Sequence, residues 1–515
     1  MPVFKLVITL LLVGAILAAL ARRIKAPYPA LLAFAGAALA LLPGLPEVTL
    51  DPELALTLLV APVLLDAAFD SSPRDLRHHW RAVTGLALVA VGLTVVAAAA
   101  VARWLVPELP WAAAIALGAI VAPPDAAAAT AVLNQLRPPH RILVILQGES
   151  LFNDASALLI YRFAVAAAVT GSFAGWAAVP TFLLVAVGSV ILGVIAARIS
   201  MWLTPRITDV PTSVIVQFLG TFAVWMLADQ IHLSGILTVV VFAIMVARRA
   251  PDLIPARLRI QSYAVWEVVV FILNVLAFIL IGLQLKPILA RLSGTELATY
   301  TAAALAVCAT VIVVRIVWVL SYSTVARWGG AKASTGETIV VAWCGMRGIV
   351  TLAAALALPD GAAPFPARDF ILFTAFSVVL VTLVVQGMTV GPLMRMVCLR
   401  DDGSVEREVR LARAETARAA LAAVDGSGAG DGDIVGFLRR KYQVRLLRAE
   451  AGDEALDPAE ADDWRAFATA QERAYVEERR RLSDLRARGV IGDDAFHRIE
   501  EELDWAQVNA ETRRQ

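Results

Sequence analysis

The stretch Gly118-Ala-Ile-Val-Ala-Pro-Pro-Asp-Ala126 lies in the middle of the apolar run 111–134. Its two consecutive prolines remove two backbone N–H donors, so carbonyl groups of the preceding turn lose their helical partners. Lipid supplies no donor, and such a break must therefore be buried in protein or line a wet cavity. A second interruption, Cys344-Gly-Met-Arg-Gly348, divides the run 336–358. Interrupted helices in corresponding positions of two halves indicate the midplane binding site of a transporter.

The composition places most of this chain in a membrane. Of its 515 residues, 59% are hydrophobic and 17% are charged, with a mean hydropathy of +0.73. A soluble domain carries about 25% charged residues. Residues 1–400 hold most of the apolar runs and predict a polytopic membrane domain, whereas residues 401–515 are rich in charge and predict a small helical cytoplasmic tail. The net charge of +1 gives no footprint for nucleic acid, which we exclude as a partner.

The number of spans follows from the length that a bilayer requires. A helix needs about 20 mostly apolar residues to cross the hydrocarbon core. Charges, prolines and glycines divide the chain into thirteen apolar runs, which predicts an all-α fold with about thirteen transmembrane helices. The runs are 3–21, 28–45, 52–69, 82–105, 111–134, 142–168, 178–202, 211–228, 233–248, 262–285, 297–321, 336–358 and 368–396. The eighth and ninth runs are short enough to be miscounted as one.

Basic residues alternate between the loops that join these runs. The loops after odd-numbered runs hold most of them, for example Arg22, Arg74, Arg141 and Arg248. By the positive-inside rule, this alternation predicts a multi-pass protein of the cell (inner) membrane, with its N-terminus outside and its C-terminus in the cytoplasm. The positive cluster follows the first run instead of preceding it, so that run predicts a retained anchor and not a cleaved signal peptide.

Ionisable residues within the apolar runs are the strongest functional signal, because each costs about 2.5–3.5 kcal/mol at the centre of a membrane helix. They are Asp66, Asp125, Glu149, Asp154, Arg162, Glu267, Arg315 and Arg347. The two interruptions lie in the fifth and twelfth runs, and this spacing of seven predicts that runs one to six recur, inverted, as runs eight to thirteen. Two unrelated kinks are the alternative, but the neighbouring acids favour the repeat.

The sixth run carries Gln147-Gly-Glu-Ser-Leu-Phe-Asn-Asp154. On a helix, Glu149 and Asn153 are neighbours, and so are Ser150 and Asp154, which places oxygen ligands on one side. Hard monovalent cations prefer such oxygens. A lone carboxylate that carries either a proton or a cation is neutral in both states, which suits exchange and suppresses leak. We expect Asp125 and Arg347 to compensate the dipole ends of the interrupted helices.

The motif Gln147–Asp154 resembles the sixth-span signature of the cation:proton antiporter superfamily, in the branch of bacterial and archaeal sodium/proton antiporters and animal sodium/hydrogen exchangers. Four further stretches resemble that branch: Pro62-Val-Leu-Leu-Asp-Ala-Ala68, His232-Leu-Ser-Gly-Ile236, Trp266-Glu267 with Asn274 and Phe278-Ile-Leu-Ile-Gly-Leu-Gln284, and Gly345-Met-Arg-Gly348. The tail stretch Arg488-Gly-Val-Ile-Gly-Asp-Asp-Ala-Phe-His497 is similar to that of bacterial members.

The resemblance implies a homodimer in the lipid bilayer with thirteen helices, of which the fifth and twelfth are unwound and crossed. It implies a dimerisation part from spans 1–3 and 8–10 and a core part from spans 4–6 and 11–13. By the same likeness, Asp154 alternately binds proton and cation, Ser150 is a cation ligand, and Asn153 goes with one-for-one, electroneutral exchange. Glu149 is expected to form an ion pair with Arg347 that holds span six against span twelve.

One motif departs from the family pattern, at two positions. The fifth-span motif usually has Thr before the Asp and Pro after it, and these positions are Pro124 and Ala126 here. Pro124 has no hydroxyl to offer a cation, which leaves the choice among Na⁺, K⁺ and Li⁺ open. Asp66 and Glu267 are secondary candidates, since packing or access to water also explains acids near the ends of spans three and ten.

Other classes of protein fit less well. The sequence has no H-E-x-x-H motif, no zinc spacing and no repeated channel filter, so we expect no enzyme activity and no cofactor besides the transported ions. The one match to G-x-G-D, Gly428–Asp431, lies in the hydrophilic tail and is attributed to chance. A proton-coupled transporter of an organic ion or drug stays open as an alternative, because two broken helices suit such folds too. The glycine-rich segment 425–433 predicts a flexible linker in the tail.

Overall fold

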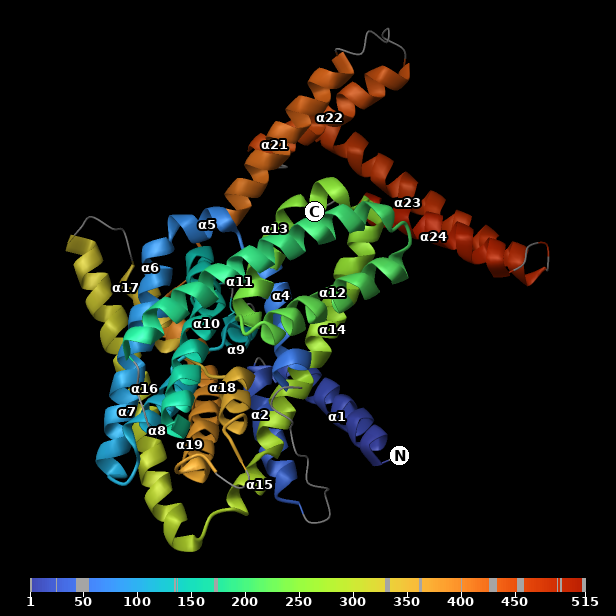
Figure 1. The fold of residues 1–515 in the computed structure, drawn as a ribbon. Helices are drawn as coiled ribbons and strands as arrows, with labels where there is room; N and C mark the ends of the chain where they lie inside the picture. The colour runs from blue at the N-terminus through green and yellow to red at the C-terminus, as the bar shows by residue number, and fades with distance from the viewer. Residues whose placement is uncertain are drawn as a thin grey trace. The chain divides into compact units, whose positions relative to one another are not determined.

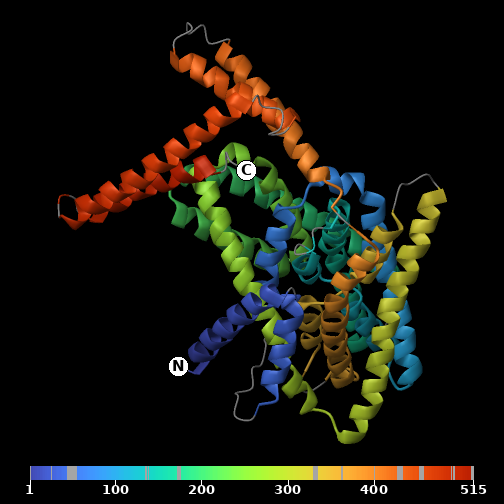
Figure 2. The same ribbon diagram turned by 180° about the vertical axis from the view of Figure 1, so that it is seen from behind.

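The computed structural model describes residues 2–24, 26–42, 55–133, 136, 138–170, 175–328, 334–360, 364–399, 401–425, 433–451, 458–488, 490 and 493–511. Every regular element within these ranges is a helix. The chain forms two compact units, Met1–Asp402 and Gly403–Gln515. Their helices are coloured from blue to red along the chain in Figure 1, and Figure 2 gives the opposite view.

The helices of the first unit follow the apolar runs. They are α1 (Pro2–Ile24), α2 (Tyr28–Ala40), η1 (Ala55–Val60) with α4 (Ala61–Phe69), α5 (Pro73–His78), α6 (Trp80–Thr84) with η2 (Gly85–Ala90) and α7 (Val91–Leu105), α8 (Trp111–Val121), α9 (Ala126–Leu133), α10 (His140–Thr170), α11 (Gly175–Leu203), η3 (Thr204–Arg206), α12 (Val210–Gln230), α13 (Gly235–Leu253), α14 (Ala256–Leu283), α15 (Leu285–Leu289), α16 (Gly294–Trp328), α17 (Thr335–Trp343), α18 (Ile349–Leu356), and α19 (Arg368–Val381) with η4 (Thr382–Gln386) and α20 (Gly387–Met396).

Each of the thirteen predicted runs overlaps one helix or one interrupted pair. Within the described residues, eight helices are long and apolar enough to cross a membrane, and three shorter apolar helices accompany them. The eighth and ninth runs are separate helices, α12 and α13, because the turn between them passes through His232 at a φ of 60°. The total number of membrane crossings and the inverted repeat stay predictions.

Both expected interruptions are present. Span five consists of α8 and α9, which are separated at Ala122–Asp125, and span twelve consists of α17 and α18, which are separated at Cys344–Gly348. Spans three, four and thirteen each include a π-helical segment, η1, η2 and η4. Such segments widen a helix locally and are frequent at functional sites.

One hydrophobic cluster, which includes Leu117, Val307 and Phe370, draws its buried residues from spans four to six and eleven to thirteen. The other cluster takes buried residues from both predicted parts, among them Leu133 and Phe278, so the division into a dimerisation part and a core part stays a prediction. Elsewhere, α2 lies along α14, and their backbones nearly touch: a Cβ on Gly36 would lie 2.3 Å from the Ile279 carbonyl oxygen, and one on Gly282 would lie 2.2 Å from that of Ala33. Small residues permit this close approach of membrane helices.

The second unit contains two helical hairpins. The helix α21 (Ser404–Asp425) packs against α22 (Asp433–Ala451), and α23 (Pro458–Ala487) packs against α24 (Asp493–Glu511). Ion pairs join the helices of each hairpin, Arg418 with Glu450 in the first and Arg479 with Asp504 in the second. The predicted linker 425–433 and the G-x-G-D match lie largely outside the described residues, as does part of the tail motif 488–497.

Candidate cation and proton site

The break in span five is held open by its own side chains. The two prolines end α8 at Val121, and the chain resumes a helix at Ala126. The Ala127 amide donates a hydrogen bond of 2.8 Å to Asp125 Oδ1, so Asp125 caps the N-terminus of α9. A carboxylate in this position stabilises the positive end of a helix dipole. Asp125 is therefore placed as dipole compensation requires.

The break in span twelve places Arg347 against the other half of span five. Arg347 is 1% exposed, and its guanidinium donates from Nε to the Val121 carbonyl at 3.0 Å and from Nη2 to the Ala122 carbonyl at 3.2 Å. Its Nη1 donates to the Gly345 carbonyl, and its backbone amide donates to Thr382 Oγ1 at 3.0 Å. The charge of Arg347 thus satisfies carbonyls that the broken C-terminal end of α8 leaves unpaired.

The two breaks touch each other directly. The Asp125 amide donates a hydrogen bond of 2.7 Å to the Met346 carbonyl, which joins the unwound backbone of span five to that of span twelve. The Asp125 carboxylate lies against Gly348, where an added Cβ would stand only 1.6 Å from Oδ2. Glycine is therefore required at position 348 for this close approach.

The predicted ion pair between Glu149 and Arg347 is wrong. Glu149 instead binds Arg315 of α16 through two parallel hydrogen bonds, at 2.5 Å to Oε1 and 2.8 Å to Oε2. Arg315 also donates to the Val341 carbonyl in the last turn of α17, at 3.1 Å from Nη2. The reason is geometric: the carbonyls of the fifth-span break engage Arg347, whereas Arg315 extends from α16 toward Glu149.

The remaining predicted ligands lie on α10 beside the breaks. Asn153 is fully buried, and its Nδ2 donates a hydrogen bond of 3.1 Å to the Pro124 carbonyl, which joins span six to the fifth-span break. The Oδ1 of Asn153 is buried without a hydrogen-bond partner. Asp154 is 6% exposed, and among the described residues its carboxylate has no hydrogen bond and no ion pair. Ser150, one turn earlier, is buried as well.

The secondary candidates Asp66 and Glu267 lie on helices other than the two interrupted spans. Asp66 on α4 is half-buried and interacts electrostatically with Asp70 and with Glu267, which is exposed on α14. Arg162 forms an ion pair of 3.1 Å with Asp229 and does not reach the buried centre. Within the described residues, no group of three or more His, Cys, Asp or Glu side chains is arranged to hold a metal ion.

Three buried polar residues, Arg315, Thr382 and Gln386, had no role assigned from the sequence. Arg315 was named only among the ionisable residues of the apolar runs, and Thr382 and Gln386 were not considered. Gln386 follows Thr382 by one turn in η4, and both atoms of its amide are buried without a partner among the described residues. The available signal was the presence of Thr382 and Gln386 within the apolar run 368–396.

Comparisons with known proteins agree with this geometry. Residues 7–396 match the family described as "Sodium/hydrogen exchanger, transmembrane". An uncharacterized Na⁺/H⁺ exchanger of Mycobacterium tuberculosis is 31% identical over 98% of this chain and 96% of its own length. A sodium, potassium, lithium and rubidium/H⁺ antiporter of Bacillus pumilus is 30% identical over 82% of this chain and 65% of its own length.

A solved structure shares the fold. The sodium/proton antiporter MjNhaP1 of Methanocaldococcus jannaschii, determined at pH 8, superposes with a TM-score of 0.62 and 17% sequence identity. The match covers 77% of this chain and 99% of that protein. At this identity the likeness concerns the arrangement of helices alone.

Proposed function

This chain belongs to the sodium/hydrogen exchanger family, a family of membrane-spanning cation:proton antiporters, and we propose that Asp154 is the carboxylate through which it exchanges the two ions. The observation that carries the proposal is that Asp154 is buried and has no hydrogen bond or ion pair among the described residues, while the other buried acid, Glu149, is neutralised by Arg315. A buried carboxylate without a partner requires a proton or a cation.

The groups around Asp154 fit a small hard cation. Asn153 Oδ1 is a buried acceptor without a donor, and Ser150 lies one helical turn before Asp154 on the same side. Carboxylate, amide and hydroxyl oxygens are the ligands that such cations prefer. Asn153 and Ser150 are therefore proposed as ligands beside Asp154, and Asp125 as a second carboxylate that acts mainly on the helix dipole.

The charges around the breaks favour one-for-one exchange. The ionised side chains there are three acids, Asp125, Glu149 and Asp154, and two arginines, Arg315 and Arg347, which gives a formal charge of −1. One proton or one monovalent cation makes this centre neutral. A loaded centre of either kind then crosses the membrane at low electrostatic cost, whereas an empty one does not.

The identity of the transported cation is inferred from Pro124 and from the name of a relative. Pro124 supplies no hydroxyl, and its carbonyl already accepts a hydrogen bond from Asn153. Fewer rigid ligands favour a broad range of monovalent cations. The relative in Bacillus pumilus carries the name of an antiporter for sodium, potassium, lithium and rubidium, which supports the same breadth here. The proposal is thus exchange of Na⁺ or K⁺ for H⁺.

The surroundings of the centre complete the proposal. Spans four to six and eleven to thirteen form the core that moves past a part made by spans one to three and eight to ten, which also forms a homodimer. The N-terminus lies outside the cell membrane and the tail 403–515 lies in the cytoplasm.

The test uses purified protein in liposomes with an imposed pH gradient. We expect Na⁺, K⁺ or Li⁺ to collapse the gradient at a rate that does not change when valinomycin and K⁺ clamp the voltage. Asp154→Asn abolishes the collapse, whereas Asp229→Asn, which changes an exposed acid of the same type, retains it. A voltage-dependent rate contradicts electroneutrality, and full activity of Asp154→Asn overturns the role of Asp154.

The alternative substrate is an organic ion. It requires a roomy site that includes the titrating carboxylate. The described cavity of about 370 Å³ between α6, α10, α11 and α13 is lined by neither Asp154 nor Asp125, so it gives this alternative no support. If an organic cation collapses the pH gradient and no alkali cation does, transport of an organic ion replaces alkali-cation exchange as the proposed function.

A further inference from the structure

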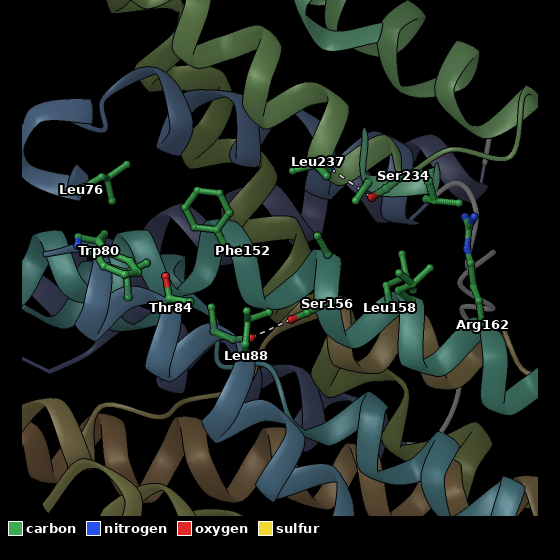
Figure 3. Close-up of a pocket in the computed structure, with 16 residues that line it drawn as sticks. Leu76, Trp80, Thr84, Leu88, Phe152, Ser156, Leu158, Arg162, Ser234 and Leu237 are labelled. Carbon is green, nitrogen blue, oxygen red and sulfur yellow. Dashed lines mark hydrogen bonds between the residues drawn. The ribbon is translucent and has the colours of Figure 1, made fainter. Parts of the chain in front are cut away.

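A cavity of about 370 Å³ lies beside the predicted site and takes no part in the exchange described above. It runs between α6 with η2 and α10 on one side and α11 and α13 on the other. Figure 3 shows that it is elongated, with Leu76, Trp80 and Thr84 toward one end and Arg162 at the other. Phe152, Leu158 and Leu237 line its middle.

The lining is mostly hydrocarbon. Ser156 Oγ donates a hydrogen bond of 2.8 Å to the Ala87 carbonyl, and Ser234 Oγ accepts one of 3.3 Å from the Leu237 amide. Both hydroxyls are thus engaged within the protein, as the dashed lines in Figure 3 indicate. Among the described residues that line the cavity, none is acidic. A buried water needs two to four polar partners, so the middle of this cavity is unsuited to water.

The end at Arg162 has a different chemistry. The Arg162 side chain is 43% exposed and uses Nη2 for its ion pair with Asp229. A guanidinium has five N–H donors in a planar fork and binds phosphate well. The cavity therefore joins a cationic donor at one end to an apolar channel, which is complementary to an anionic headgroup with an acyl chain.

We propose that this cavity binds one acyl chain of an anionic phospholipid, with the phosphate at Arg162. Two of its walls come from α10 and from the span that contains η2, helices long and apolar enough to cross a membrane. Lipid acyl chains surround helices of this kind in a membrane. The lining of the cavity is apolar and therefore suits such a chain. Each buried methylene of the chain contributes about 0.8 kcal/mol.

The position of the chain gives it a consequence for exchange, which rests on the function proposed above. On one wall, Ser156 joins α10 to η2; on the other, the Ser234 amide donates a hydrogen bond of 2.9 Å to Ser189 Oγ of α11. The acyl chain lies between these walls and contacts α10, which carries Asp154. Movement of α10 relative to α11 and α13 changes the width of the cavity, so the bound lipid favours the conformation described here.

The binding test does not depend on transport. The full-length protein is reconstituted in nanodiscs with phosphatidylglycerol that carries a diazirine in its acyl chain, and labelled peptides are identified by mass spectrometry. We expect labels on α10 near Phe152–Leu159 and on α13 near Leu237. Ala186→Phe on α11 fills the cavity and lowers this labelling about tenfold, the change expected when about two methylenes lose their site. Ile191→Phe, an exposed residue of the same helix outside the lining, leaves it unchanged.

A second variant tests the headgroup. Arg162→Gln keeps the labelling but lowers the preference for phosphatidylglycerol over phosphatidylcholine about fivefold, the effect of about one basic residue at a membrane surface. Equal labelling of all exposed helices, or labelling that Ala186→Phe does not change, overturns the lipid site. If the unsubstituted protein is labelled as expected but shows no cation:proton exchange in liposomes, the proposed function is contradicted and the lipid site is still supported.

Discussion

The broken ends of α8 and α17 face the same physical problem and solve it differently. At each end, helical carbonyls lose their partners in the interior of the protein, and a buried arginine donates to them. Arg347 serves Val121 and Ala122 of α8, and Arg315 serves Val341 of α17. The difference is that Arg315 also has a counter-ion, Glu149, whereas Arg347 contacts backbone carbonyls and no carboxylate among the described residues.

This difference shows how a protein places net charge inside a membrane. A buried arginine with a carboxylate partner adds no net charge, while one held by carbonyl dipoles keeps its full charge. Arg347, which has no hydrogen-bonded carboxylate among the described residues, lies at the junction of the two breaks, where the Asp125 amide meets the Met346 carbonyl. Removal of one arginine is therefore expected to differ from removal of the other, both in its cost and in its coupling to Glu149.

The largest effect is expected from Arg315→Met. Glu149, which is 1% exposed, then loses its partner in the interior. Breaking a buried pair in this way costs about 3–5 kcal/mol, which we expect to find in the free energy of unfolding, measured by titrating the micelle-solubilised protein with dodecyl sulfate. The double variant Glu149→Gln with Arg315→Met removes the stranded charge and recovers a large part of the loss. No recovery in the double variant contradicts the ion pair.

A smaller loss is expected from Arg347→Leu. The carbonyls of Val121 and Ala122 lose charged hydrogen bonds, which costs about 2–3 kcal/mol in the same titration. Because Glu149 forms its hydrogen bonds with Arg315 and not with Arg347, we expect a smaller coupling energy between Glu149→Gln and Arg347→Leu than between Glu149→Gln and Arg315→Met. A coupling energy between Glu149 and Arg347 as large as that between Glu149 and Arg315 would instead support an ion pair between Glu149 and Arg347.

Gly348→Ala tests the contact between the two breaks. The new methyl group collides with the Asp125 carboxylate and forces the junction apart, at a cost of about 1–3 kcal/mol in the free energy of unfolding. Exchange activity in liposomes falls with it. Gly92→Ala is the matched control, since no heavy atom lies within 4 Å of the added Cβ on α7, and a gain of up to about 1 kcal/mol is expected there.

The smallest change, and one of opposite sign, is expected from Gln386→Leu. Its amide is buried without a partner among the described residues, so replacement by an apolar group of similar size raises the free energy of unfolding by about 1 kcal/mol. Gln217→Leu is the contrast. Gln217 accepts hydrogen bonds from Ser262 and Trp266, so its loss destabilises the protein. Equal effects of the two variants contradict the unpaired amide.

The helices and their interruptions could be predicted because few alternatives exist. Apolar runs of this length form membrane helices, Pro123-Pro124 interrupts one of them, and Gly345 and Gly348 weaken another. The location of the acids followed from the same argument, since a charge within an apolar run has to be buried or functional. Side-chain pairing could not be predicted. The choice between Arg315 and Arg347 as the partner of Glu149 depends on the rotation of α16 and on the depth of the fifth-span break, and neither is a property of residue spacing.

The close crossing of α2 and α14 has a mechanical consequence. At Gly36 and Gly282 the two backbones meet with no side chain between them, so neighbouring Cβ atoms act as stops on either side. Sliding either helix along the other by one residue would bring a methyl group into a space sized for hydrogen. This crossing therefore resists sliding of one helix along the other and fixes α2 and α14 in register.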